Sequence, residues 1–283
     1  ALPPIAFVIG ALLDGRREVA DVRKAVLDQL KVEVSEDEVQ NVVRDLDQHL
    51  LLDSARSRAR RLELENAFLS LPRRPARFVP GTAEEISKVL DSFYAAEAGA
   101  GKAGEARPEA LAGILAPHID FQRGGTCYTH AYRQLAERST ADLYVILGVA
   151  HLSPPNPFIF TAKDYETPFG PVATDRGFLA AVEKRLGKQI YEHEAVHRNE
   201  HSAEFQAVFL KHARPRDAFT VVPVLVSAFE QWCGDASPST AGEIEDVLGA
   251  IREAAAGRNV CYVAGVDFAH VGPVFGDDVE VDQ

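Results

Sequence analysis

Residues 143–151 read LYVILGVAH, a run of apolar side chains that ends in a histidine. Such a run without polar alternation is typical of a strand covered on both faces, as in a parallel sheet. Two more runs have this form: residues 111–115 lead into His118, and residues 260–266 lead into His270. We therefore predict strands whose carboxyl ends carry histidines.

Helical patterns alternate with these runs. They occupy roughly residues 126–137, 176–186, 202–212 and 242–255, and residues 220–226 form a further apolar run. Strands that alternate with helices predict an α/β fold, here a central sheet with flanking helices. In such sheets ligands bind outside the carboxyl ends of the strands.

Four histidines are expected to gather at this edge of the sheet. His118, His151 and His270 follow three separate strands, and His201 lies where a helix begins, one turn from Glu204. A single histidine after a strand is commonly a loop residue, but three strand ends that finish this way predict one shared site. Imidazoles and carboxylates together bind divalent metals or transfer protons near neutral pH.

Other histidines and the cysteines receive structural interpretations. His193 and His197 lie in a charged stretch and are expected to be exposed. Cys127 and Cys261 are expected to be buried structural thiols, with Cys261 inert. The three cysteines show no Cys-x-x-Cys spacing, and no signal peptide is visible, so we expect a reducing cytoplasmic location.

The N-terminal part is organised differently. We expect a small helical domain over residues 1–62, a proline- and arginine-containing linker over 63–80, and the α/β domain over 81–283. Ser35 and Glu38 form a capping-box pattern that predicts a helix start. The helical order is similar to a winged-helix module, but its acidic residues favour docking of a protein or peptide over DNA binding.

The overall charge points the same way. A formal net charge of −12 opposes a nucleic-acid partner, and the run Arg56, Arg58, Arg60 and Arg61 is interpreted as a solvated helix face or linker. No apolar run reaches the length that crosses a membrane. The sequence starts at Ala1 and contains no methionine, so we expect that residues are missing from it.

Five segments together resemble the Memo family, in order and spacing. They are residues 116–118 (APH), 148–151 (GVAH), 165–170 (YETPFG), 200–204 (EHSAE) and 266–272 (VDFAHVG). The resemblance covers about residues 70–283. It implies a fold similar to class III extradiol dioxygenases, in which iron is bound by two histidines and a carboxylate.

The resemblance also implies roles for individual residues. His118 and His151 match the two metal-binding histidines of the family, and His201 matches a third histidine at the same cavity. Residues 167–171 are placed at the rim of that cavity, where they are expected to form a rigid turn. Ala269 stands where family members with a metal site have cysteine.

Because alanine has no electron pair to donate, any metal would take further ligands from His201, Glu204, Asp267, His270 or water. The alternatives are iron, zinc on three histidines and water, or a metal-free site in which His118 and His201 act as acid and base.

Two functions follow as expectations. The first is a metal-dependent, dioxygenase-like oxidoreductase for a small aromatic or polar ligand, with His118, His151 and His201 as ligands and His201 and His270 as catalytic residues. The second is a non-catalytic component that binds a peptide or ligand in a multi-protein modification system. Prokaryotic Memo relatives are usually named as AmmeMemoRadiSam system protein B, so the resemblance implies AMMECR1-like and radical-SAM partners.

Overall fold

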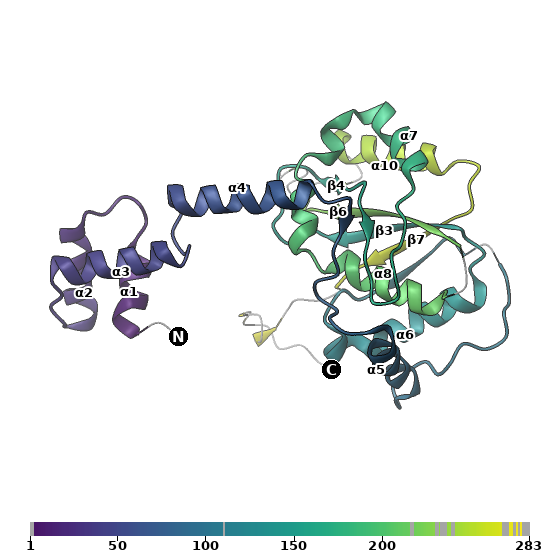
Figure 1. Cartoon of the computed structure of the whole chain (residues 1–283), viewed down its shortest axis with the longest axis horizontal. Coiled ribbons are helices and arrows are strands. Elements are labelled where there is room, and N and C mark those ends of the chain that lie inside the picture. The colour runs from purple at the N-terminus through teal and green to yellow at the C-terminus, as the bar shows by residue number, and fades with distance from the viewer. Residues whose placement is uncertain are drawn as a thin grey trace. The chain divides into compact units, whose positions relative to one another are not determined.

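The computed structural model of the chain (Figure 1) describes residues 3–109, 111–215, 218–229, 232, 237, 238, 241–267, 272, 273, 276 and 278. The chain divides into two compact units, Ala1–Ala67 and Phe68–Gln283. Among the described residues, no helix is both long enough and apolar enough to span a bilayer.

The first unit is helical. It contains α1 (Pro4–Leu12), α2 (Val19–Leu30) and α3 (Glu36–Gln48) around a small apolar core. The predicted capping box at the start of α3 is confirmed, because Ser35 Oγ accepts from Glu38 N at 3.2 Å and Glu38 Oε2 accepts from Ser35 N at 2.7 Å. The described part of this unit shows helices alone, and the winged-helix comparison stays a prediction.

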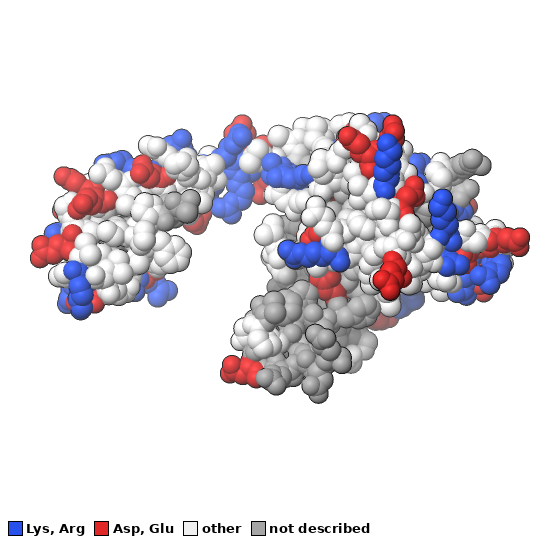
Figure 2. Space-filling model, turned by 90° about the horizontal axis from the view of Figure 1, so that it is seen from below, with Lys and Arg blue, Asp and Glu red and all other residues white. Residues whose placement is uncertain are grey.

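The arginine run lies on α4 (Ala55–Leu69), which is rich in the helix formers alanine, leucine, arginine and glutamate. The basic side chains gather along this helix in Figure 2. They are exposed and pair with nearby acids: Arg58 Nη1 lies 3.3 Å from Asp53 Oδ1, and Arg60 Nη1 lies 2.7 Å from Glu63 Oε2. The interpretation of a solvated helix face is confirmed.

The expected linker over residues 63–80 differs from what the structure shows. Residues 63–69 continue α4, and the α/β unit begins at Phe68. Within residues 73–79, Arg74 and Val79 are buried. The buried carboxylate of Glu204 orders this segment, because a buried charge requires hydrogen-bond donors. Arg74 and three backbone N–H groups of the segment donate to it.

The α/β fold class is confirmed. The central sheet has the strand order β2-β7-β3-β6-β4, and only β4 runs antiparallel to its neighbour. Its strands are β2 (Gly113–Ala116), β7 (Val260–Gly265), β3 (Leu143–Val149), β6 (Thr220–Val226) and β4 (Phe158–Phe160). A separate two-stranded parallel sheet pairs β1 (Arg73–Arg74) with β5 (Asp164–Tyr165).

Helices cover the sheet on both faces, and two apolar clusters fill the layers between them (Figure 1). One face carries α5 (Ala83–Ala95), α6 (Phe121–Arg138) and α8 (Ser202–Ala213), and the other carries α7 (Arg176–Leu186) and α10 (Gly242–Ala255). Two 3-10 helices, η1 (Lys188–Tyr191) and η2 (Glu194–Asn199), precede α8.

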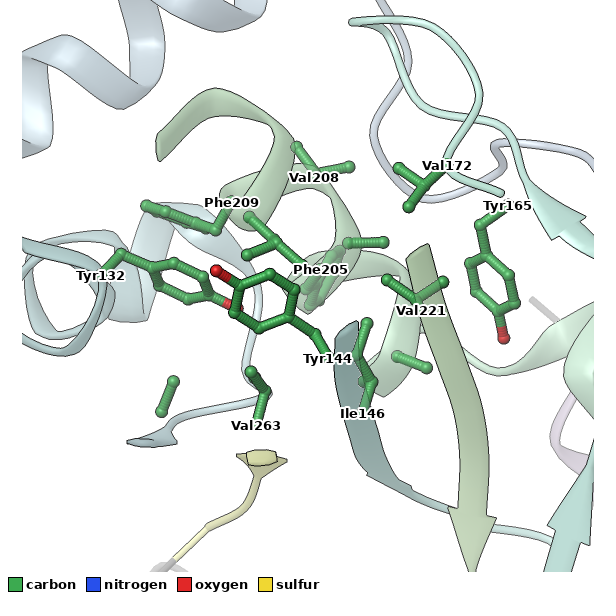
Figure 3. Close-up of a cluster of buried hydrophobic side chains, with 14 of the residues drawn as sticks. Tyr132, Tyr144, Ile146, Tyr165, Val172, Phe205, Val208, Phe209, Val221 and Val263 are labelled. Carbon is green, nitrogen blue, oxygen red and sulfur yellow. The ribbon is translucent and has the colours of Figure 1, made fainter. Parts of the chain in front are cut away.

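Helix α8 lies in the middle of the larger cluster. Its residues 202–210 are all buried. Figure 3 shows Phe205, Val208 and Phe209 of this helix beside the aromatic rings of α6 and β3. The ring of Phe209 stacks on Tyr128, with centroids 4.6 Å apart. This packing fixes the position of α8, and therefore of the residues at its N-terminus.

Candidate metal centre

Three of the predicted site histidines come together. His118 follows β2, His151 follows β3, and His201 is the N-cap residue of α8. One ring nitrogen from each lies within 4.8 Å of the other two. The closest pair is His118 Nε2 and His151 Nε2, which are 3.3 Å apart. His270 and its neighbour Ala269 lie outside the described residues.

The end of β3 is joined directly to the start of α8. Ser202 Oγ accepts from Val149 N and donates to Val149 O, both at 2.9 Å. Gly148 permits this close approach, because a Cβ at that position would lie 2.6 Å from Ser202 Oγ and 3.0 Å from Ala203 N. His151 and His201 therefore sit on two segments whose spacing is fixed by backbone contacts.

The loop after β2 is held by the same helix. Gln206, one turn along α8 and fully buried, donates from Nε2 to Pro117 O at 2.8 Å. Its Oε1 accepts from Tyr132 OH at 2.9 Å, which sets the orientation of the amide. Because Pro117 immediately precedes His118, α8 positions all three histidines of the cluster.

Glu200 connects two of the histidines through its carboxylate. Oε1 accepts from the backbone N–H groups of His201 and Ser202, at 2.8 and 3.0 Å. Oε2 accepts from His151 N at 3.1 Å and lies 2.9 Å from His151 Nδ1. A carboxylate in this position retains the proton on Nδ1 and leaves Nε2 of His151 with its lone pair toward His118.

The site is buried at one side and open at the other. The side chain of His118 is 7% exposed, that of His201 is 30% exposed, and that of His151 is 49% exposed. His118 Nδ1 is buried, and no hydrogen-bond partner is present for it among the described residues. A small ligand therefore reaches the cluster from the side of His151.

The electrostatics favour neutral imidazoles. Burial lowers the pKa of His118 and of His201, although Asp267 beside the first and Glu200 beside the second act in the opposite direction. Burial alone would raise the pKa of Glu200, but the N–H of Ser202 and the His151 ring outweigh burial and lower it. At neutral pH the imidazoles of His118 and His201 are thus uncharged and lie next to an ionised carboxylate.

These residues fit a divalent metal. Three imidazoles supply the nitrogen donors that zinc and iron accept. The carboxylate on the far nitrogen of His151 is the usual companion of a metal-binding histidine. Asp267 Oδ2 lies 3.5 Å from His118 Nε2, so a carboxylate is also close to the cluster.

Glu204, one of the further ligands that the sequence suggested, has a different role. Its side chain is completely buried, and Oε2 binds Arg74 Nη1. Oε1 accepts from the N–H groups of Arg77, Phe78 and Val79 at 2.8–3.1 Å. Because both oxygens are engaged in these contacts, Glu204 supports the structure next to the site.

The two histidines expected to be exposed behave differently. His193 is exposed, as predicted. The prediction for His197 is wrong, because this residue is fully buried and lies between Tyr165 OH, 2.8 Å from Nδ1, and Ile159 O, 3.0 Å from Nε2. The carbonyl of Ile159 only accepts, so Nε2 of His197 donates a hydrogen bond to it. Nδ1 of the neutral ring is then the acceptor, and the hydroxyl of Tyr165 donates to it. His197 is thus buried in spite of its charged sequence neighbours, because Tyr165 and Ile159 satisfy both of its ring nitrogens.

The turn at residues 167–171 is present. Thr167 Oγ1 donates to Gly170 O at 2.6 Å, and Gly170 has a φ of 97°, which favours glycine. The turn lines a surface pocket of about 440 Å³ together with Arg73 and Glu166. The lining of that pocket includes none of the three clustered histidines, and the rim position that the resemblance implied stays a prediction.

Sequence reasoning missed several supporting residues. Glu200 had a usable signal, because it directly precedes His201 in a helix-start segment. Gln206 and Arg74 had none, since their partners Pro117 and Glu204 are 89 and 130 residues away in the sequence. Their roles became visible once the folded contacts were known.

Comparisons with known proteins give a consistent result. The family model described as Memo-like protein matches residues 72–283. A MEMO1 family protein of Aquifex aeolicus is 27% identical over 98% of this chain and 70% of its own length. One from Methanopyrus kandleri is 31% identical over 70% of this chain and 67% of its own. One from Thermus thermophilus is 27% identical over 92% of this chain and 74% of its own length.

Proposed function

The chain belongs to the Memo family, and from that premise we propose that it is a metal-dependent, dioxygenase-like oxidoreductase whose divalent metal is bound by His118, His151 and His201. The observation that carries the proposal is the convergence of three imidazole nitrogens within 4.8 Å of one another. The carboxylate of Glu200 behind His151 supports it, because such pairs are typical of metal-binding histidines.

A bound iron would supply the redox chemistry, with dioxygen as the oxidant, whereas zinc has no redox chemistry and would only polarise a small ligand as a Lewis acid. The protein residues provide the rest of the proposed chemistry. Glu200 fixes the proton of His151 on Nδ1, and burial keeps His118 neutral so that its ring nitrogen is available as a donor atom. The open side at His151 admits a small aromatic or polar molecule.

His201 is proposed either as a metal ligand or as the acid/base residue, because a neutral imidazole has one lone-pair nitrogen and cannot fill both roles at once. Burial lowers its pKa, so its imidazole is neutral at neutral pH and is able to accept a proton from a ligand. Its ring also lies against aromatic side chains, with centroid distances of 5.6 Å to Phe78 and 5.1 Å to Phe205. The ring faces of Phe78 and Phe205 would suit an aromatic substrate. A catalytic role of His270 belongs to the same proposal.

A second candidate function is a non-catalytic binding component. The observation that favours it is Ala269, which stands where the family resemblance calls for a cysteine ligand. In this case the cavity would recognise a peptide or modified side chain supplied by AMMECR1-like and radical-SAM partners, and the helical N-terminal unit would dock them. A cytoplasmic location is proposed for both functions, and the free thiols Cys127 and Cys261 suit such a reducing setting.

Elemental analysis separates the two candidates. The full chain purified without added metal is compared with the His118→Ala and His151→Ala double variant and with His193→Ala as a control for an exposed histidine. One equivalent of metal in the wild type and in His193→Ala, and none in the double variant, supports the metal-dependent enzyme. Lack of metal in all three after anaerobic iron loading favours the binding component.

A further inference from the structure

The buried guanidinium of Arg74 is linked to the histidine cluster through the segment that precedes α8. Arg74 is completely buried. Its Nε donates to His197 O at 3.0 Å, its Nη2 donates to Glu200 O at 2.7 Å, and its Nη1 pairs with Glu204. One planar side chain therefore contacts three points along residues 197–204, at both sides of His201.

The segment that contains α8 also holds the segment that contains Arg74. The Glu204 carboxylate, which pairs with Arg74, also accepts the N–H groups of Arg77, Phe78 and Val79. The two segments thus hold each other. Phe78, held in this way, lies against the His201 ring. Because a buried charge without a partner is costly, neither segment is able to shift without breaking several of these contacts.

Glu200 transmits this constraint to His151. Its backbone carbonyl is bound by Arg74, while its side chain binds His151 N and His151 Nδ1. A displacement of the Glu200 backbone would move the carboxylate and release the ring of His151. The contact of Arg74 with the Glu200 backbone is therefore linked, through the Glu200 carboxylate, to the Nδ1 side of the His151 ring.

We propose that Arg74 is a positioning residue of the metal centre, which fixes Glu200 and thereby orients His151 and His201 for metal binding. This inference rests on the proposed function. Arginine is required because its planar group reaches two carbonyls and a carboxylate at once, whereas a lysine ammonium is a single point charge. Lysine at this position would retain the ion pair with Glu204 but not all of the carbonyl contacts.

The test uses the full chain with Arg74→Lys and, as a matched control, Arg73→Lys, because Arg73 is the exposed neighbour on the same strand. In the metal-free protein, ¹⁵N NMR of the imidazoles reports the tautomer of His151. We expect one tautomer, protonated on Nδ1, in the wild type and in Arg73→Lys, and a mixture in Arg74→Lys. Titration with Co²⁺ should give roughly tenfold weaker binding and altered visible bands in Arg74→Lys alone.

A second variant covers the case in which Arg74→Lys does not fold. Arg74→Met combined with Glu204→Gln removes both buried charges and retains an oxygen that accepts the N–H groups, and it should change the His151 tautomer in the same way. If a folded Arg74 variant keeps the wild-type tautomer and Co²⁺ affinity, the inference is wrong. If the wild type binds no Co²⁺ but the Arg74 variants alter the tautomer, positioning is supported and the metal proposal fails.

Discussion

Glu200 Oε2 lies 2.9 Å from Nδ1 of His151, so the carboxylate fixes the half of the imidazole that faces away from the histidine cluster. The same oxygen accepts the backbone N–H of His151 at 3.1 Å. Ring and backbone of His151 are thereby held by one group. The nitrogen that faces His118 is left with its lone pair, which is the form that a metal ligand requires.

Replacing this carboxylate tests its contribution. Glu200→Gln retains the size of the side chain but removes its charge and replaces one accepting oxygen with an NH₂ donor, so the proton of His151 is held less firmly on Nδ1. We expect the affinity for Co²⁺ or Zn²⁺ to fall by roughly 10- to 100-fold in a competition titration. Glu192→Gln, an exposed acid in the preceding segment, should leave the affinity unchanged. Equal affinities of wild type and Glu200→Gln would show that the carboxylate does not tune the site.

The contact between α8 and β3 is predicted to contribute to stability. Ser202→Ala removes two buried hydrogen bonds to Val149 and leaves its N–H and C=O with fewer partners. Urea unfolding should show a loss of about 1–3 kcal/mol. Ser92→Ala, at an exposed serine that bonds only to Val89 O, should change stability by less than about 0.5 kcal/mol. A loss no larger than that of the control would contradict the structural role of Ser202.

The burial of His197 predicts that the free energy of unfolding depends on pH. Burial lowers the pKa of His197 to about 3 from the ordinary value of 6.5. Between these values the unfolded chain binds a proton that the folded chain does not, so stability falls as pH decreases from about 6.5 toward 3. The contribution of this one group reaches about 1.4 kcal/mol per pH unit.

Urea unfolding at pH 7, 6 and 5 measures this effect. His197→Gln should show a smaller decrease with acid than the wild type, whereas His193→Gln, at an exposed position, should follow the wild type. Identical slopes for His197→Gln and the wild type would mean that His197 is not buried in its neutral form.

The cysteines predict a selective labelling pattern. Burial raises the pKa of the Cys261 thiol to about 11. The prediction that Cys127 is buried is wrong, because this residue lies on the exposed face of α6. Treatment with a maleimide at neutral pH, followed by peptide mapping, should modify Cys127 rapidly and Cys261 only after denaturation. Rapid modification of Cys261 in the folded protein would contradict its burial in the larger apolar cluster.

Local patterns explain which parts of the fold were predictable. The continuous apolar runs at residues 143–147 and 220–226 and the helices at residues 176–186 and 242–255 are confirmed nearly to the residue. Each of these elements is encoded by its own periodicity and by the parallel-sheet pattern. The histidines at the strand ends followed from the same reasoning, since parallel strands end at one edge of the sheet.

Long-range contacts explain what was missed. Arg74 reads as part of a proline-rich linker, and its burial depends on Glu204, which lies 130 residues further along the chain. His197 stands in a charged stretch, but its burial depends on Tyr165 and Ile159. Short strands such as β4 and β5 carry too few residues for a pattern and form by pairing with distant segments.

We propose that His118, His151 and His201 together bind one divalent metal. Anomalous diffraction from crystals of the full chain grown with Zn²⁺ tests it most directly, with data collected on both sides of the zinc edge. We expect one strong peak within about 2.0–2.1 Å of a ring nitrogen from each histidine. A map without a peak between the three rings, at zinc concentrations that saturate exposed surface sites, would contradict it.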